Sequence, residues 1–215
     1  MIHHRKKFIF IHIPKCGGSS ITKQAFFKKR SQENAHKSIS EYAKTKDLTK
    51  FKQFSITRNP WDRIVSLYFF WRNMNKKHPY YKWDKYAVQF IHDKNLNFEE
   101  FVQAIYSKNS KKFFFKSYDF ENHKTKKEID HTKSQRSLLE NNGLVNLTFI
   151  GRFENLQNDF DKICDIIKIP RSTLPHANKS PHKHYSEYYN DRTREMIERK
   201  YKEDIKEFGY NFWHE

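Results

Sequence analysis

A lysine, two glycines and two serines stand together near the start of the chain, in the run Ile-Pro-Lys-Cys-Gly-Gly-Ser-Ser at residues 13–20. The apolar run at residues 8–11 predicts a strand before it, and the residues after it predict a helix. A glycine turn between a strand and a helix presents backbone N–H groups to an anion, and the helix N-terminus adds positive potential. We therefore expect residues 14–20, called the cradle below, to bind a phosphate-bearing ligand.

A second motif, Arg-Asn-Pro-Trp-Asp-Arg-Ile-Val-Ser, covers residues 58–66 and follows another expected strand at residues 51–57. Pro60 favours the start of a helix, so Arg58 leaves the strand and Ser66 lies two turns into the helix. A guanidinium offers several donors in one plane to an anion. We expect Arg58 and Ser66 to hold a second phosphate.

Strand and helix patterns alternate along the chain, which predicts an α/β fold with a P-loop-like, mostly parallel sheet flanked by helices. Ligands of such sheets bind at the carboxyl ends of the strands, where both motifs are expected. The expected strands cover residues 7–13, 51–57 and 147–151. The expected helices cover residues 19–30, 60–72, 98–106 (opened by a capping box at Asn97 and Glu100), 131–141, 154–167 and 191–208.

The length of 215 residues favours one domain over residues 1–215. Residues 107–130 are rich in lysine and show no clear period, so we expect an inserted loop or a lid there. The chain has no transmembrane segment of about 18 apolar residues and no leader-like apolar stretch. Two widely separated cysteines, Cys16 and Cys164, fit a reducing compartment, and we expect a soluble, cytoplasmic protein.

The chain is strongly basic, with 42 Lys and Arg against 25 Asp and Glu and a formal net charge of +17. This balance favours a polyanionic partner, namely an anionic cofactor, an anionic glycan or a nucleic acid, although a solvated basic surface explains it equally well. Residues 73–85 and 107–127 interleave aromatic residues with lysines, which suits an anionic saccharide as well as a solvated loop.

The two motifs in this order resemble the PAPS-dependent sulfotransferase superfamily, whose donor is 3′-phosphoadenosine 5′-phosphosulfate (PAPS). The later stretches Phe-Ile-Gly-Arg-Phe-Glu-Asn-Leu at residues 149–156, Asn-Lys-Ser-Pro-His at 178–182 and Asp-Ile-Lys-Glu-Phe-Gly-Tyr at 204–210 are similar to the carbohydrate branch related to heparan 2-O and chondroitin enzymes. The resemblance spans nearly the whole chain. It implies transfer of a sulfuryl group from PAPS to a hydroxyl of a glycan acceptor, which leaves adenosine 3′,5′-bisphosphate.

The resemblance also implies a role for each motif. Lys15 would stabilise the leaving phosphate, because positioning and charge dominate such transfers and no metal is required. Arg58 and Ser66 would hold the 3′-phosphate, and Lys179 with Ser180 would close over it. The turn that would bind the 5′-phosphosulfate consists of Cys16, Gly17, Gly18, Ser19 and Ser20. Relatives often carry threonine in place of Cys16, which is here a small loop residue or a thiol with a lowered pKa.

The acceptor hydroxyl needs a base, and a neutral imidazole is the natural one near pH 7. His36 lies between the cradle and the next strand, where related glycan sulfotransferases place a catalytic histidine. A helix over residues 131–141 would instead put His131 and Gln135 on one face, where both could touch a sugar. We favour His36 and keep His131 open. Arg152 and Glu154 flank the end of an expected strand, and we expect an ion pair between their side chains.

Two other classes of protein share some of these features. A nucleotide kinase would carry its lysine after the second glycine and an acidic residue for a metal, whereas Lys15 precedes the glycines. A nucleic-acid-binding protein would explain the charge and the aromatic residues, but not the spacing of Arg58 and Ser66. None of the histidines has the spacing of a zinc site, so no metal is expected. We expect a glycan or another hydroxyl-bearing acceptor as partner, and no nucleic acid.

Overall fold

The computed structural model describes residues 1–24, 36–107, 130–175 and 181–213. They form two compact units. The first unit comprises residues 1–59, 133–179 and 203–215, and the second comprises residues 60–132 and 180–202. Most of the predicted lid at residues 107–130 lies outside the described residues, and a single domain over residues 1–215 stays a prediction.

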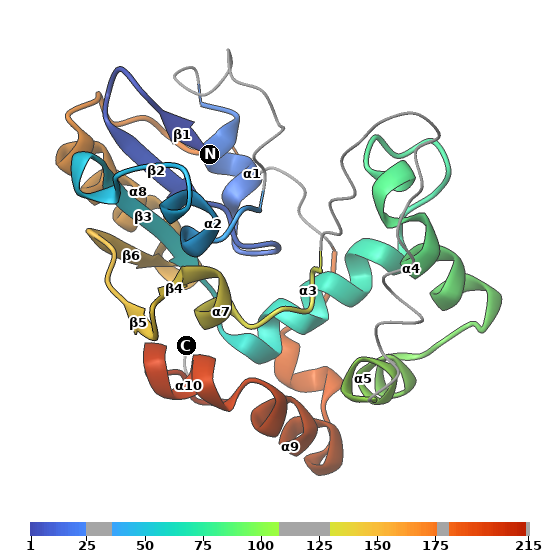
Figure 1. The fold of residues 1–215 in the computed structure, drawn as a ribbon. Coiled ribbons are helices and arrows are strands. Elements are labelled where there is room, and N and C mark those ends of the chain that lie inside the picture. Colours follow the sequence, from blue (N-terminus) through green and yellow to red (C-terminus); the bar gives the residue numbers. More distant parts are fainter. Residues whose placement is uncertain (25–35, 108–129, 176–180, 214–215) are drawn as a thin grey trace. The chain divides into compact units, whose positions relative to one another are not determined.

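The first unit contains a four-stranded sheet in the order β1 (Ile2–His3), β2 (Phe8–Ile11), β3 (Lys52–Thr57) and β6 (Phe149–Arg152), drawn in Figure 1. β2, β3 and β6 are parallel, and β1 is an antiparallel edge strand. The predicted α/β fold with a mostly parallel sheet is therefore confirmed. Because β2 and β3 are parallel neighbours, the two motifs that follow them begin at the same edge of the sheet.

Helices cover both faces of this sheet. On one face α8 (Leu156–Ile167) packs very closely at Gly151, where a Cβ would lie 2.7 Å from Ile56 Cδ1 and 2.9 Å from a side-chain carbon of α8. α2 (Ile39–Ala43) and α7 (Gln135–Leu139) lie on the other face in Figure 1. The remaining elements of this unit are short: α1 (Gly18–Thr22), η3 (Leu48–Lys50), η4 (Phe153–Asn155) and α10 (Lys202–Phe208).

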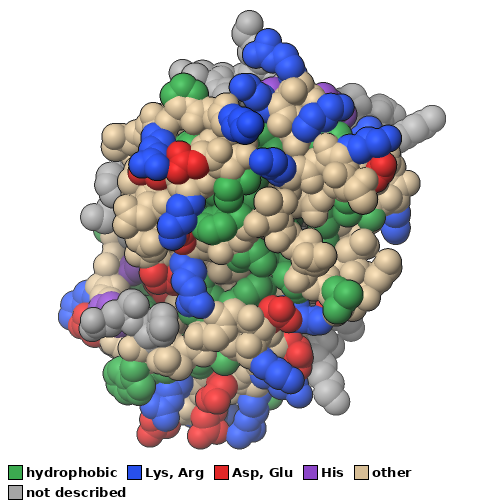
Figure 2. All heavy atoms as spheres, turned by 90° about the vertical axis from the view of Figure 1, so that its left-hand side faces the viewer, with side chains coloured by type: hydrophobic (Ala, Val, Ile, Leu, Met, Phe, Trp, Pro, Cys, Tyr) green, Lys and Arg blue, Asp and Glu red, His purple; other side chains and the backbone are tan. Residues whose placement is uncertain are grey.

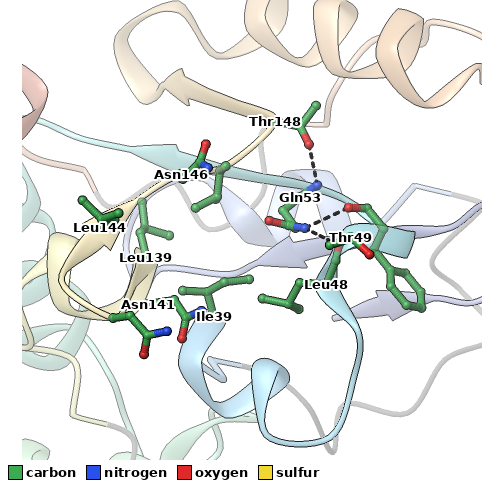
Figure 3. Close-up of a pocket in the computed structure, with 12 residues that line it drawn as sticks. Ile39, Leu48, Thr49, Gln53, Leu139, Asn141, Leu144, Asn146 and Thr148 are labelled. Carbon is green, nitrogen blue, oxygen red and sulfur yellow. Dashed lines mark hydrogen bonds between the residues drawn. The ribbon is translucent and has the colours of Figure 1, made fainter.

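A small hairpin of β4 (Glu140–Asn141) and β5 (Leu144–Val145) follows α7. Its two-residue turn has positive φ at Asn142 (53°) and at Gly143 (79°), the type I′ conformation that matches strand twist. Beside the hairpin, at the amino ends of β3 and β6, lies a cavity of about 560 Å³, which we call the amino-end hollow (Figure 3). It is lined by apolar and uncharged polar side chains, among them Ile39, Leu48, Gln53, Leu139, Asn146 and Thr148.

The second unit is helical, with α3 (Pro60–Arg72), α4 (Tyr81–Asp93), α5 (Phe98–Tyr106), η5 (Tyr185–Tyr188) and α9 (Asp191–Lys200). Aromatic rings form much of its interior: Tyr68 lies 5.3 Å from Phe101 between ring centroids, and Trp71 lies 6.1 Å from the same ring. Two predictions are confirmed, because α3 begins at Pro60 and the capping box at Asn97 opens α5.

Three predicted helices differ from the observed ones. The helix expected over residues 19–30 is α1 at Gly18–Thr22, and residues 25–35 lie outside the described part of the chain. The helix expected over residues 131–141 is wrong in its extent, because Ser134 caps α7 and Gln135 is its first residue. The last helix divides into α9 and α10 at Tyr201.

The positive charge is widely spread. Figure 2 shows Lys and Arg side chains over much of the viewed face, with Asp and Glu among them. Within the described ranges, no helix is both long and apolar enough to span a membrane.

Candidate functional site

The cradle connects β2 to α1 through a turn of unusual backbone conformation. Lys15 and Gly17 both have positive φ, 66° and 74°, and such residues form the concave turns that bind anions through backbone N–H groups. Gly17 also lies against the stretch at residues 149–156, since a Cβ there would come within 2.8 Å of Leu156 Cδ2 and 3.1 Å of Phe153 Cδ2. The backbone and the packing both require glycine at this position.

The side chains of the cradle differ in exposure. Lys15 and Ser19 are partly exposed, whereas Ser20 is buried and its N–H donates to the Gly17 carbonyl oxygen at 3.0 Å. The Cys16 thiol is also buried, 3.3 Å from Gln135 Oε1. Cys16 is therefore packed as a small interior residue, in line with the plainer of its two predicted roles.

Arg58 joins the two motifs. Its Nη1 donates to the Lys15 carbonyl oxygen at 3.0 Å, and its guanidinium carbon lies 3.9 Å from the centroid of the Phe153 ring. A guanidinium that lies over an aromatic face keeps the N–H groups at its edge directed outward in its own plane, where they can meet an anion. The structure thus brings Arg58 of the second motif to the backbone of the cradle.

The residues on either side of Arg58 are held by the side chains of Glu154 and the buried Tyr210. Asn59 N–H donates to Glu154 Oε1 at 2.6 Å, and the Tyr210 hydroxyl lies 3.0 Å from Thr57 Oγ1 and 3.3 Å from Glu154 Oε2. Burial first, and then the nearby Glu154 carboxylate, raise the pKa of Tyr210 far above its usual value. The neutral phenol therefore acts as a fixed link between β3 and Glu154.

The predicted ion pair between Arg152 and Glu154 is wrong. Arg152 lies over the Tyr210 ring, 4.6 Å from its centroid, and donates to the Phe208 carbonyl oxygen. Glu154 is directed instead to the Asn59 backbone. The two side chains leave a strand end in different directions, because residues 152 and 153 change from strand to 3₁₀ conformation.

His36 contacts His12, and His12 in turn contacts the cradle. The His36 Nδ1 is 2.8 Å from the His12 carbonyl oxygen, and the two rings are 4.4 Å apart. The His12 ring in turn covers Gly18, where a Cβ would come within 2.0 Å of His12 Cδ2. Because a carbonyl only accepts, Nδ1 of His36 carries the hydrogen and Nε2 carries the lone pair.

Ser66 and His131 belong to the second unit. Ser66 is buried in the second turn of α3. His131 is buried as well, with its ring stacked 5.7 Å from Trp71 and its Nε2 3.7 Å from Asp84 Oδ1. It lies in a turn before α7, so the helical spacing predicted for His131 and Gln135 is wrong.

Two predicted donor residues, Lys179 and Ser180, lie outside the described residues. The part of the chain that the structure describes holds no group of three or more His, Cys, Asp or Glu side chains placed to bind a metal ion. The roles of Ser66, His131, Lys179 and Ser180 stay predictions.

Sequence reasoning missed how the site is supported. Gln135 was predicted to touch a sugar, yet its side chain is fully buried and binds the Arg58 backbone. Asp204 and Tyr210 lie in the stretch at residues 204–210, for which the family resemblance implies no role. No local signal marks these contacts, since each joins residues at least 56 positions apart.

The comparisons with known proteins agree with this geometry. The model of the sulfotransferase family matches residues 1–211, which is nearly the entire chain. No curated protein and no solved structure shows a significant match. Because the family model covers both motifs and all strands of the sheet, the chain belongs to the sulfotransferase family.

Proposed function

We propose that this sulfotransferase transfers a sulfuryl group from PAPS to a hydroxyl group of a carbohydrate. The observation that carries the proposal is the hydrogen bond from Arg58 Nη1 to the Lys15 carbonyl oxygen. It brings the cation of the second motif to the backbone of the first. A donor with a 5′-phosphosulfate and a 3′-phosphate has two anionic groups, and this site offers a cation and a turn of N–H groups for them.

The residues around the cradle have separable roles in this proposal. PAPS supplies the sulfuryl group together with a phosphate leaving group. Lys15 neutralises negative charge that develops on the leaving oxygen, and the cradle N–H groups orient the 5′ end. Arg58 holds the 3′-phosphate, with Ser66 as its expected second contact. Lys179 and Ser180 are proposed to close over this phosphate.

His36 is the base that the geometry favours. Its Nδ1–H bond to the His12 carbonyl fixes the tautomer, so Nε2 can accept the proton of an acceptor hydroxyl. His131 packs instead between Trp71 and Asp84, in the interior of the second unit. We therefore assign the proton transfer to His36.

Donor recognition can be tested without an acceptor. Isothermal titration should give a dissociation constant for adenosine 3′,5′-bisphosphate at least tenfold below that for AMP or ATP, and Arg58→Ala should remove this preference. Arg171→Ala, which removes an exposed ion pair with Asp165, is the matched control and should keep it. Preference for ATP in the wild-type protein would contradict the proposal and favour a kinase.

The role of His36 needs a rate measurement. His36→Ala should lower turnover by about 10²- to 10⁴-fold, the usual contribution of a positioned base, while the affinity for the bisphosphate stays within about threefold. His92→Ala removes an exposed ring in the second unit and is the control. An equal loss of turnover in His131→Ala with none in His36→Ala would reverse the assignment.

The second unit offers a surface for an anionic saccharide. Tyr80 and Trp83 are large aromatic side chains with exposed fractions of 36% and 43%, and their rings lie 6.4 Å apart. Lys82 Nζ lies 4.0 Å from the centroid of the Trp83 ring. Further lysines of this stretch are Lys76, Lys77 and Lys85, while its one acidic residue, Asp84, is buried. Aromatic faces pack on sugar rings, and lysines pair with carboxylate or sulfate groups, so this surface supports an anionic carbohydrate acceptor.

Binding of defined polymers tests this acceptor class. Trp83→Ala should weaken binding of a uronate-containing oligosaccharide about tenfold, because the aromatic face on which a sugar ring would pack is lost. Trp213→Ala, at an exposed tryptophan of the first unit, should leave binding unchanged. A neutral dextran of equal length should bind weakly to all variants. Tighter binding of single-stranded DNA than of any saccharide would overturn the carbohydrate proposal.

A further inference from the structure

Gln135 makes a reciprocal pair of hydrogen bonds with the backbone of Arg58. Its Oε1 accepts from Arg58 N–H at 2.9 Å, and its Nε2 donates to the Arg58 carbonyl oxygen at 2.8 Å. The side chain is fully buried, and the same Oε1 lies 3.3 Å from Cys16 Sγ. One amide thus contacts the backbone of the second motif and a side chain of the cradle.

Gln135 is itself held in place from α10. Asp204, which is fully buried, accepts from the Gln135 N–H at 2.8 Å, from the Ser134 hydroxyl at 2.6 Å and from the Arg136 N–H at 2.8 Å. These bonds fix the first turn of α7, and with it the backbone position from which the Gln135 side chain extends. A chain of buried hydrogen bonds therefore runs from α10 through α7 to Arg58.

We propose that Gln135 is a positioning residue for the donor, which fixes the Arg58 turn so that the guanidinium is directed to the 3′-phosphate. Arg58 is the first residue after β3, where the strand no longer supplies a neighbour for its backbone N–H and carbonyl. Gln135 takes the place of that neighbour. Without it, both backbone groups would lose the hydrogen bonds that hold them in this position, and the turn would be free to shift.

The proposal rests on the function proposed above, and it makes a distinct claim about selectivity. Adenosine 3′,5′-bisphosphate and AMP share the adenosine and the 5′-phosphate, and they differ in the 3′-phosphate that Arg58 is proposed to hold. A residue that acts through Arg58 must change the affinity for the first ligand far more than for the second. A residue that only stabilises the fold has no reason to distinguish them.

The test measures the dissociation constants of both nucleotides by isothermal titration. Gln135→Met keeps the length of the side chain and removes both hydrogen bonds, and it should weaken the bisphosphate about tenfold and AMP less than threefold. The double variant Gln135→Met/Arg58→Ala should bind the bisphosphate no more weakly than Arg58→Ala alone. Both changes act on the same contact, that of Arg58 with the 3′-phosphate. Should the methionine variant fail to fold, Gln135→Asn keeps the amide but shortens its reach to the Arg58 backbone, and it should likewise weaken the bisphosphate more than AMP.

Gln157 offers a matched control in the same unit. Its amide also makes one bond of each kind to backbone, from Leu174 N–H at 2.8 Å and to the Ser172 carbonyl oxygen at 3.1 Å. Gln157→Met should leave both affinities unchanged. Equal weakening of both nucleotides in the Gln135 variants, or none, would overturn the positioning role while wild-type selectivity stands. A wild-type protein that does not prefer the bisphosphate would overturn the proposed function and this role together.

Discussion

The two ends of the central sheet in the first unit differ in the structure that surrounds them. At the carboxyl end, the turn after β3 is held by the buried side chains of Gln135 and Tyr210. At the amino end lies the hollow shown in Figure 3, bordered by the exposed Leu144 and Asn146. Burying polar groups costs free energy unless every bond is made, so such networks are found where a backbone must be fixed. The contrast is that buried polar contacts fix the backbone at the carboxyl end, where the donor site is proposed.

Two aspartates that accept hydrogen bonds from the first turns of short helices sharpen this contrast most. Asp204→Ala should lower the free energy of unfolding by about 3 kcal/mol, because three hydrogen bonds to a buried carboxylate are lost and two N–H groups of α7 are left without an acceptor. Asp47→Ala at the amino end removes two bonds to Thr49 and an exposed ion pair with Lys50, and it should cost much less because Asp47 is exposed. Urea unfolding of both variants measures the difference. Equal losses would mean that burial does not distinguish the two ends.

Two glycines make the next comparison. Gly18→Ala should lower the free energy of unfolding by about 2 kcal/mol, because the new Cβ would overlap the His12 ring, and overpacking outweighs the helix propensity of alanine. Gly143→Ala should cost about 1 kcal/mol from its positive φ alone, since no atom lies within 4 Å of its Cβ position.

Removal of the overlapping ring supplies the control. His12→Ala combined with Gly18→Ala should recover part of the loss, and thermal unfolding of the single and double variants gives the coupling. Additive losses would show that the Gly18 contact is not the cause.

The strands and the position of the cradle could be predicted because they depend on local sequence. Apolar runs of strand length, a glycine pair and Pro60 each signal their structure within a few residues. The resemblance to sulfotransferases then added the order of the motifs. These signals were sufficient for the fold class and for the meeting of Lys15 and Arg58.

The supporting contacts could not be predicted in the same way. Gln135 lies 77 positions from Arg58, and nothing in a single sequence marks an amide that will pair with a distant backbone. The expected helix at residues 131–141 also made Gln135 a surface residue beside His131. Because Ser134 caps α7, the helix starts later and Gln135 points inward.

Alkaline pH should expose the link formed by Tyr210. Its pKa is raised in the folded protein above the ordinary value of 10, so its contribution to stability is complete below pH 10 and is lost as the pH rises toward the folded-state pKa. Between pH 9 and pH 11 the free energy of unfolding should fall by about 1 kcal/mol from this residue. Tyr210→Phe should flatten the slope, as measured by urea unfolding.

Part of the alkaline slope will remain in the Tyr210 variant. Burial also raises the pKa of Tyr42, and it raises that of Cys164 to about 11. Tyr106→Phe, at an exposed ring of the second unit, should leave the slope as in the wild-type protein. An unchanged slope in Tyr210→Phe would mean that this phenol ionises without unfolding.

The smallest effects are expected at the amino-end hollow. Leu144→Ser and Asn146→Ala change side chains that are exposed to solvent, so each should alter the free energy of unfolding by less than about 0.5 kcal/mol. The affinity for adenosine 3′,5′-bisphosphate should also stay within the error of the titration, because the donor site is assigned to the opposite end of the same strands. Weaker nucleotide binding in either variant would show that the two ends are coupled through β3. In that case the hollow could no longer serve as the reference against which the carboxyl end is judged.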